Sequence, residues 1–293
     1  MLTNEYIEEA VNTDGPVCPT CGQTGDGKFC AKCGEQIQLK PDYSLRGLVA
    51  ETLNIVTNLE SNIFRSFGLL IAKPGFLTAE YFAGRRKRYL KPLQLFIFCN
   101  VIFFFFQAFT GFNSMRTPLQ VHLNRMPYSR FIKGKVADAI TERGTTFAAY
   151  ETRFNATIET QAKTLVFLMI PMFALGLEAL YLLKKEYFVK HLIFSTHFFG
   201  FYLLMLSVTY LGVTVAAMVI SRLQGTHRLF IGDVGLTIIV LGAAFVYLLV
   251  AVRRVYNQSL LWAGLSTLGL IGVLAVVVQT YRFILFFTAF YSI

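Results

Sequence analysis

Residues 192–220 read LIFSTHFFGFYLLMLSVTYLGVTVAAMVI and contain no Lys, Arg, Asp or Glu. A helix of about 20 apolar residues is long enough to cross the hydrocarbon core of a bilayer. Four further stretches are similarly apolar, at about residues 93–112, 164–183, 234–252 and 260–281. The sequence therefore predicts an all-α polytopic membrane protein with about five transmembrane helices.

The composition supports this prediction. Of the 293 residues, 55% are hydrophobic and 15% are charged, and the mean hydropathy is +0.53. A soluble domain carries about 25% charged residues. The net charge is +10, and many Lys and Arg residues flank apolar runs. This arrangement indicates contact with the anionic headgroups of a lipid bilayer and argues against nucleic acid as a partner.

Four of the five cysteines form a set near the N-terminus, in CPTCG at 18–22 and CAKCG at 30–34. Two C-x-x-C pairs separated by eight residues are typical of a four-cysteine zinc ribbon, with Cys18, Cys21, Cys30 and Cys33 as ligands. Four protein ligands leave no open coordination position, so we expect structural Zn²⁺. Two disulfides or a redox pair are the alternatives, and a cytoplasmic location disfavours both. Cys99 lies in an apolar run and is interpreted as a buried thiol.

The chain divides into three predicted regions. Residues 1–40 form a polar leader and the zinc ribbon, and residues 41–92 form an amphipathic interfacial helix and a basic juxtamembrane segment. Residues 93–293 form the transmembrane bundle, with an external helical loop at about 113–163. Apolar residues recur at helical spacing from Ser44 to Ala72, in a helix that either lies on the cytoplasmic leaflet or packs against the bundle.

The distribution of charge predicts the topology. The first residues, MLTNEYIEE, lack the basic and apolar regions of a signal peptide. We therefore expect a cytoplasmic N-terminus, which puts the cations at 85–91, 184–190 and 253–254 on the cytoplasmic side and the C-terminus outside. The tail, residues 283–293, either extends the fifth helix or folds back along the interface.

The predicted external loop contains amphipathic patterns. Phe147, Tyr150, Phe154 and Ile158 recur at helical spacing among charged residues, and a second helix is expected at about 131–142. These helices either cover the external mouth of the bundle or form a docking surface.

Five cations within seven residues precede the first apolar run: Arg85, Arg86, Lys87, Arg88 and Lys91. We call this set the basic collar. One interpretation is a membrane-edge anchor in contact with anionic lipid. The other is a binding site for an anionic group on a substrate or partner.

Two ionisable residues fall inside predicted spans, where such groups are costly and often functional. Glu178 and His197 each lie about 9–10 Å from the cytoplasmic ends of neighbouring antiparallel helices. His191 is shallower. The pair either relays protons, binds a metal or holds a polar headgroup, or it fixes the packing of two helices as a structural pair.

No Walker loop, G-x-S-x-G elbow, H-E-x-x-H motif or glycine fingerprint occurs in the sequence. No catalytic residues are therefore assigned, and an enzymatic function is disfavoured.

The order of motifs resembles a family of bacterial zinc-ribbon multi-pass membrane proteins of unknown function. The resemblance implies the cytoplasmic (inner) membrane of a bacterium and a similar architecture, but no activity. The segments that carry it are the two CxxCG motifs, KPG at 73–75, EYFAGRRKRYLKP at 80–92, HLIFSTHFFGF at 191–201 and RVYNQS at 254–259.

Two functions fit these observations best. The first is a membrane-embedded accessory or scaffold protein, whose zinc ribbon and external helices bind partner proteins in a membrane complex. The second is a transporter or lipid-handling protein that uses the layer of Glu178 and His197 together with the basic collar. An intramembrane enzyme is a third, less favoured hypothesis.

Overall fold

The computed structural model describes residues 16–24, 29–30, 32–33, 35, 62–110, 115–182, 186–224 and 233–293. Helices make up most of this part of the chain, which confirms the predicted all-α fold. They are α2 (Asn62–Ala72), α3 (Phe76–Phe82), α4 (Pro92–Thr110), α5 (Leu119–Arg125), α6 (Ser129–Glu142), α7 (Phe147–Leu165), the 3₁₀ turn η1 (Val166–Leu168), α8 (Met169–Tyr181), α9 (Phe188–Gln224), α10 (Asp233–Tyr256) and α11 (Leu260–Ser292).

Five helical stretches in the described residues are long and apolar enough to cross a membrane, as predicted. The protein is accordingly a multi-pass membrane protein. The stretches are Pro92–Phe109, Phe147–Tyr181, Phe188–Ile220, Gly235–Tyr256 and Leu260–Ser292.

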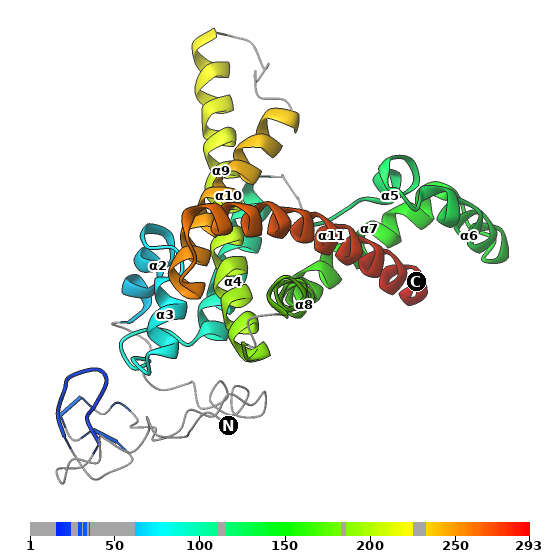
Figure 1. The fold of residues 1–293 in the computed structure, drawn as a ribbon. Coiled ribbons are helices and arrows are strands. Elements are labelled where there is room, and N and C mark those ends of the chain that lie inside the picture. The colour runs from blue at the N-terminus through cyan, green and yellow to red at the C-terminus, as the bar shows by residue number, and fades with distance from the viewer. Residues whose placement is uncertain are drawn as a thin grey trace, which may run out of the picture.

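The helices pack as a bundle around aromatic side chains. α4 lies along α9, α8 packs against α9 on another side, and α11 contacts α7, α8 and α10. Phe173 of α8 stacks on Phe198 of α9, with ring centroids 5.0 Å apart. In Figure 1 α9 runs up the page and α11 crosses it toward the right, so their C-terminal ends lie far apart.

The second span contains an interruption that Pro171 explains. Proline has no backbone N–H, so it cannot donate the helical bond to the carbonyl of the residue four positions earlier, Phe167. The 3₁₀ turn η1 covers Val166–Leu168 at this point. The amphipathic helix α7 and the apolar helix α8 are therefore joined across a short turn of different geometry.

The two helices predicted in the segment 113–163 are present as α6 and α7, and a third, α5, was not predicted; all three lie to one side of the bundle (Figure 1). Tyr150, Phe154 and Ile158 are buried on one face of α7, as the spacing predicted. We call α5, α6 and the N-terminal half of α7 the helical cap.

The C-terminal tail extends the fifth helix, which settles the two alternatives. α11 continues to Ser292 and lies against the helical cap: ring centroids of Phe286 and His122 are 5.2 Å apart, and those of Phe287 and Phe131 are 6.3 Å apart. The side-chain amide of Gln161, in the C-terminal half of α7, donates to the Ser292 hydroxyl at 3.0 Å. Residues 283–293 therefore pack against α7 and the cap.

The end of the predicted amphipathic segment packs against the bundle. Leu70 of α2 is buried in a cluster with Cys99 of α4 and Leu204 of α9, whereas Phe64 on the outer face is 86% exposed. Cys99 is buried, as expected. The remainder of this predicted segment (44–61), the leader (1–15) and residues 183–185 lie outside the described residues.

Candidate functional site at the basic collar

Cys18, Cys21, Cys30 and Cys33 lie together, with their Sγ atoms within 4.8 Å of one another. Two turns bring them there: the Gly22 N–H donates to the Cys18 carbonyl at 2.9 Å, and the Cys30 N–H donates to the Glu35 carbonyl at 2.8 Å. A tetrahedral ion with bonds of about 2.3 Å separates its sulfur ligands by about 3.8 Å. The four thiols therefore fit a single metal ion.

The cysteine cluster is docked against the basic collar. The Glu35 carboxylate accepts hydrogen bonds from the Thr20 hydroxyl at 2.8 Å and from the Lys87 backbone N–H at 2.9 Å. The Arg88 guanidinium donates to the Thr20 carbonyl at 3.3 Å. Glu35 is 4% exposed, so this acidic residue is largely enclosed at the contact. A metal held by the cysteines would therefore brace the loop that carries the collar.

The collar is not a uniform surface patch, because α3 holds two of its cations. Arg85 makes two hydrogen bonds to the Glu80 carboxylate, one of them from Nε at 2.7 Å. The hydrogen bonds and the charge of Arg85 lower the pKa of Glu80 against the opposing effect of burial. The Arg86 guanidinium lies 4.1 Å from the centroid of the Tyr81 ring, and its Nε donates to the Tyr81 carbonyl at 3.1 Å. Both side chains are thus oriented by contacts to α3.

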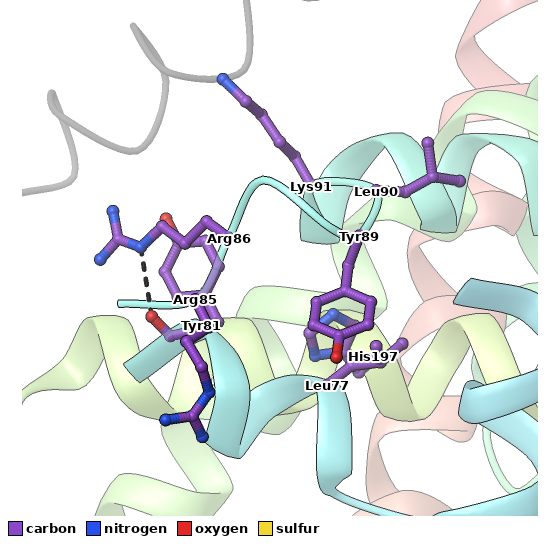
Figure 2. A pocket seen from close by; sticks show the side chains of 8 residues that line it. All are labelled: Leu77, Tyr81, Arg85, Arg86, Tyr89, Leu90, Lys91 and His197. Atoms are coloured by element: carbon purple, nitrogen blue, oxygen red, sulfur yellow. Dashed lines mark hydrogen bonds between the residues drawn. The ribbon is translucent and has the colours of Figure 1, made fainter. Parts of the chain in front are cut away.

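A pocket lies between α3, the collar loop and α9 (Figure 2). It contains about 260 Å³ of empty space, part of which is open to solvent. The structure therefore brings residues of the collar to the same pocket as the intramembrane histidine of the sequence analysis. The lining residues are Leu77, Tyr81, Arg85, Arg86, Tyr89, Leu90, Lys91 and His197.

His197 is bonded to α3. Its Nδ1 is 2.8 Å from the hydroxyl oxygen of Thr78, and both residues are buried. The predicted pairing of His197 with Glu178 is wrong, because Glu178 lies instead beside His191, with 3.4 Å between Oε2 and Nε2. The two histidines are six positions apart on α9, so they point about 120° apart around its axis. Glu178 and His197 were paired because they lie at similar depths along their helices, but His197 points away from Glu178 around the axis of α9.

A second polar cluster forms around His191. Its Nδ1 is 2.7 Å from the Tyr256 hydroxyl. The Tyr256 ring stacks on Tyr181 with 4.4 Å between centroids, and the Tyr181 hydroxyl donates to Gln258 Oε1 at 3.4 Å. The sequence segments around His191 and Tyr256, which are far apart in the chain, therefore meet at one end of the bundle.

Several residues of these sites were not found from the sequence. Thr78, Glu80 and Tyr81 lie on a seven-residue helix that shows no span-like pattern. Glu35 follows the last cysteine motif directly. An acidic residue beside a four-cysteine motif, followed later by a run of five cations, is the one signal in the sequence that could have indicated this contact.

A five-span helical bundle with a four-cysteine site docked at a basic loop defines the class: a multi-pass membrane protein with a candidate N-terminal metal site. A family model described as "Protein of unknown function (DUF3667)" matches residues 60–104. This range contains α2, α3, the basic collar and most of α4, including every lining residue of the pocket except His197. No curated protein matches the chain, and no solved structure matches it.

Proposed function

We propose that this protein is a lipid-handling membrane protein that binds the phosphate headgroup of an anionic lipid at the basic collar. The observation that carries the proposal is the pocket that joins Arg86 and Lys91 to His197. The lining residues of this pocket come from α3, the collar loop and α9, so their convergence is a property of the fold. Cationic side chains and an imidazole are suitable hydrogen-bond donors for a phosphate group.

The chemistry of the pocket fits an amphipathic ligand. Leu77, Tyr89 and Leu90 supply apolar surface, and Arg86 and Lys91 supply positive charge at the same pocket. Lys91 immediately precedes α4, the first of the five spans. Cations next to the end of a span lie at the level of the lipid headgroups. A lipid phosphate could therefore reach the collar from the bilayer.

The cysteine site has a structural role in this proposal. Four thiolate ligands favour Zn²⁺ and leave no open position for a substrate. Through Glu35 and Thr20, the ion fixes the backbone at Lys87 and the side chain of Arg88. The proposed setting is the inner membrane of a bacterium, with the N-terminus and the collar cytoplasmic and the C-terminus external.

Lipid titration of the detergent-solubilised full chain tests this function. Native mass spectrometry would count bound phosphatidylglycerol and phosphatidylcholine for the wild type and for the Arg86→Gln/Lys91→Gln double variant. We expect a preference for phosphatidylglycerol that weakens about tenfold in the variant, because charge-assisted hydrogen bonds are lost.

The matched control is Lys133→Gln/Arg143→Gln, which removes two exposed cations of the helical cap. Equal losses of phosphatidylglycerol binding in both double variants would indicate a nonspecific effect of net charge and contradict the proposal. An absence of headgroup preference in the wild type would contradict it as well.

The accessory or scaffold function is the second candidate. It is favoured by the helical cap, which lies to one side of the bundle (Figure 1) and in which Lys133, Lys135 and Asp138 of α6 are exposed. One side of the cysteine site already contacts its own chain, so the cap is the better docking surface for a partner protein. Copurification from native membranes in mild detergent tests this function, and a protein that is strictly solitary contradicts it.

A further inference from the structure

Arg282 of α11 is a cation without a counter-charge among the residues that the structure describes. Its Nε is shielded from solvent and has no hydrogen-bond partner among them. None of the ion pairs found in that part of the chain involves Arg282. An unpaired charge in partly buried surroundings is costly, and such residues often mark a binding site.

A side chain that packs one helical turn from Arg282 also has an unused polar atom. His122 of the helical cap is 0% exposed, and its Nδ1 is 2.9 Å from the Tyr128 hydroxyl. Its Nε2 is buried and has no hydrogen-bond partner in the described part of the chain. The imidazole packs 5.2 Å from the Phe286 ring, and Phe286 lies one helical turn after Arg282 on the same face of α11.

His122 and Tyr128 are both uncharged near pH 7, and the pKa of each is influenced by the positive charge of Arg282. Burial lowers the pKa of His122 to about 4, the positive charge of Arg282 acts in the same direction, and the Thr117 backbone opposes it. The imidazole is therefore neutral near pH 7. Burial raises the pKa of Tyr128 to about 12, against the opposing effect of the Arg282 charge. Tyr128 is thus also neutral near pH 7 and does not offset the guanidinium charge.

The unused atoms match one class of ligand. When the Tyr128 hydroxyl donates to Nδ1, the neutral imidazole carries its proton on Nε2. Nε2 and the guanidinium Nε are then two buried donors without a well-formed hydrogen bond among the described residues, although the Thr117 backbone lies close enough to act on the imidazole. An oxyanion supplies both acceptors and the missing negative charge, and charge-assisted hydrogen bonds of this kind are strong.

The position of Arg282 on its helix suggests where the ligand comes from. Arg282 follows the first residue of α11, Leu260, by 22 positions, or about 33 Å at 1.5 Å per residue. The hydrocarbon core of a bilayer is about 30 Å thick. Arg282 is therefore separated from Leu260 by about one hydrocarbon thickness along the helix, which is compatible with a lipid headgroup as the source of the oxyanion.

We propose that Arg282 and His122 form a second oxyanion site, under the helical cap, that binds a phosphate group between the guanidinium and Nε2. This site is separate from the collar and does not depend on the function proposed above. The phosphate belongs either to a lipid headgroup or to a soluble ion, and the experiment below distinguishes these two sources.

The experiment follows the ¹⁵N signals of His122 in the detergent-solubilised full chain, assigned with a His122→Gln variant. Inorganic phosphate, a short-chain phosphatidylglycerol and a phosphate-free diacylglycerol are titrated separately. We expect a saturable shift with phosphatidylglycerol, a shift with inorganic phosphate only if the site accepts soluble anions, and none with diacylglycerol. Arg282→Gln should weaken the response about tenfold or more.

The matched control is Arg143→Gln, which removes an exposed cation elsewhere on the cap and should leave the response intact. A wild-type His122 signal that responds to neither phosphate probe overturns the proposal. A response of unchanged affinity in Arg282→Gln overturns it too, because the cluster would then be a purely structural Arg–His–Tyr contact. If Arg282→Gln does not fold, Arg282→Lys is the substitute, because it keeps the positive charge but removes the guanidinium Nε donor. The titration of the wild type still shows by itself whether His122 responds to phosphate.

Discussion

The Nδ1 of His197 in α9 lies 2.8 Å from the hydroxyl oxygen of Thr78 in α3. Thr78 is 1% exposed and His197 is 4% exposed, so this contact attaches the short helix α3 to the interior of the bundle. It also places His197 at the pocket of the basic collar. The contact therefore connects the stability of the bundle to the geometry of the proposed lipid site.

Thr78→Val should destabilise the protein by about 1–3 kcal/mol, because it leaves a ring nitrogen of His197 buried without a partner. Thr78→Ser keeps the hydroxyl and should cost less. Denaturant unfolding of both variants in detergent checks this. A loss in free energy of unfolding that is as large or larger for Thr78→Ser would contradict this, because the methyl group would then contribute at least as much as the hydrogen bond.

Gly75→Ala should destabilise the protein by roughly 2 kcal/mol or more, because the strain of a left-handed backbone adds to a steric clash with α10. Gly75 has a φ of +73°, and an added Cβ would lie 2.8 Å from the Ala251 Cα of α10. The matched control is Gly68→Ala in α2, where a Cβ would meet no atom within 4 Å. That change should leave stability equal or raise it by up to about 1 kcal/mol. Similar unfolding temperatures for the two variants would contradict the close approach of α3 and α10.

Metal analysis of the purified chain should find one Zn²⁺ per protein, and Cys18→Ser should lose most of it, since each thiolate is one of four ligands. Cys99→Ser is the control, because Cys99 is buried in α4 away from the cluster. Chelation should also accelerate hydrogen exchange at Lys87, whose N–H donates to Glu35. Unchanged exchange there would show that the cysteine site does not brace the collar.

Stability should fall as the pH is lowered from about 6.5 to about 4, in part because of His122. The unfolded imidazole takes up a proton near pH 6.5, whereas the folded-state pKa is lowered to about 4, mainly by burial. The contribution of His122 to the free energy of unfolding is therefore complete above about pH 6.5. Below that pH it falls by up to about 1.4 kcal/mol per pH unit. Unfolding of His122→Gln should depend less steeply on pH, and parallel curves for the two proteins would contradict the buried, neutral imidazole.

The sequence predicted the five spans because each has enough apolar residues to cross the membrane. The starts of α4 at Pro92 and α11 at Leu260 agree closely with the expected limits. α9 begins at Phe188 and α10 ends at Tyr256, both slightly beyond the predicted ranges. Helical spacing also identified the buried face of α7, apart from Phe147, which is exposed. These features depend on the local spacing of apolar residues, which can be read directly from a single sequence.

The partners of polar groups could not be predicted in the same way. The depths of Glu178 and His197 were compared along the helix axes, but contact also depends on rotation about the axis. His191 faces Glu178 and Tyr256, whereas His197 faces Thr78. The contact between Glu35 and Lys87 joins residues 52 positions apart, and no periodic pattern specifies it.

Photocrosslinking tests the central claim, the lipid site at the collar, most directly. The full chain would be crosslinked with phosphatidylglycerol and phosphatidylcholine probes that carry a diazirine close to the phosphate, and modified peptides would be mapped by mass spectrometry. We expect the phosphatidylglycerol probe to label residues 77–91 and the segment around His197, and excess unlabelled phosphatidylglycerol to prevent this labelling. Equal labelling of these segments by both probes, or labelling spread evenly over the bundle, would contradict it.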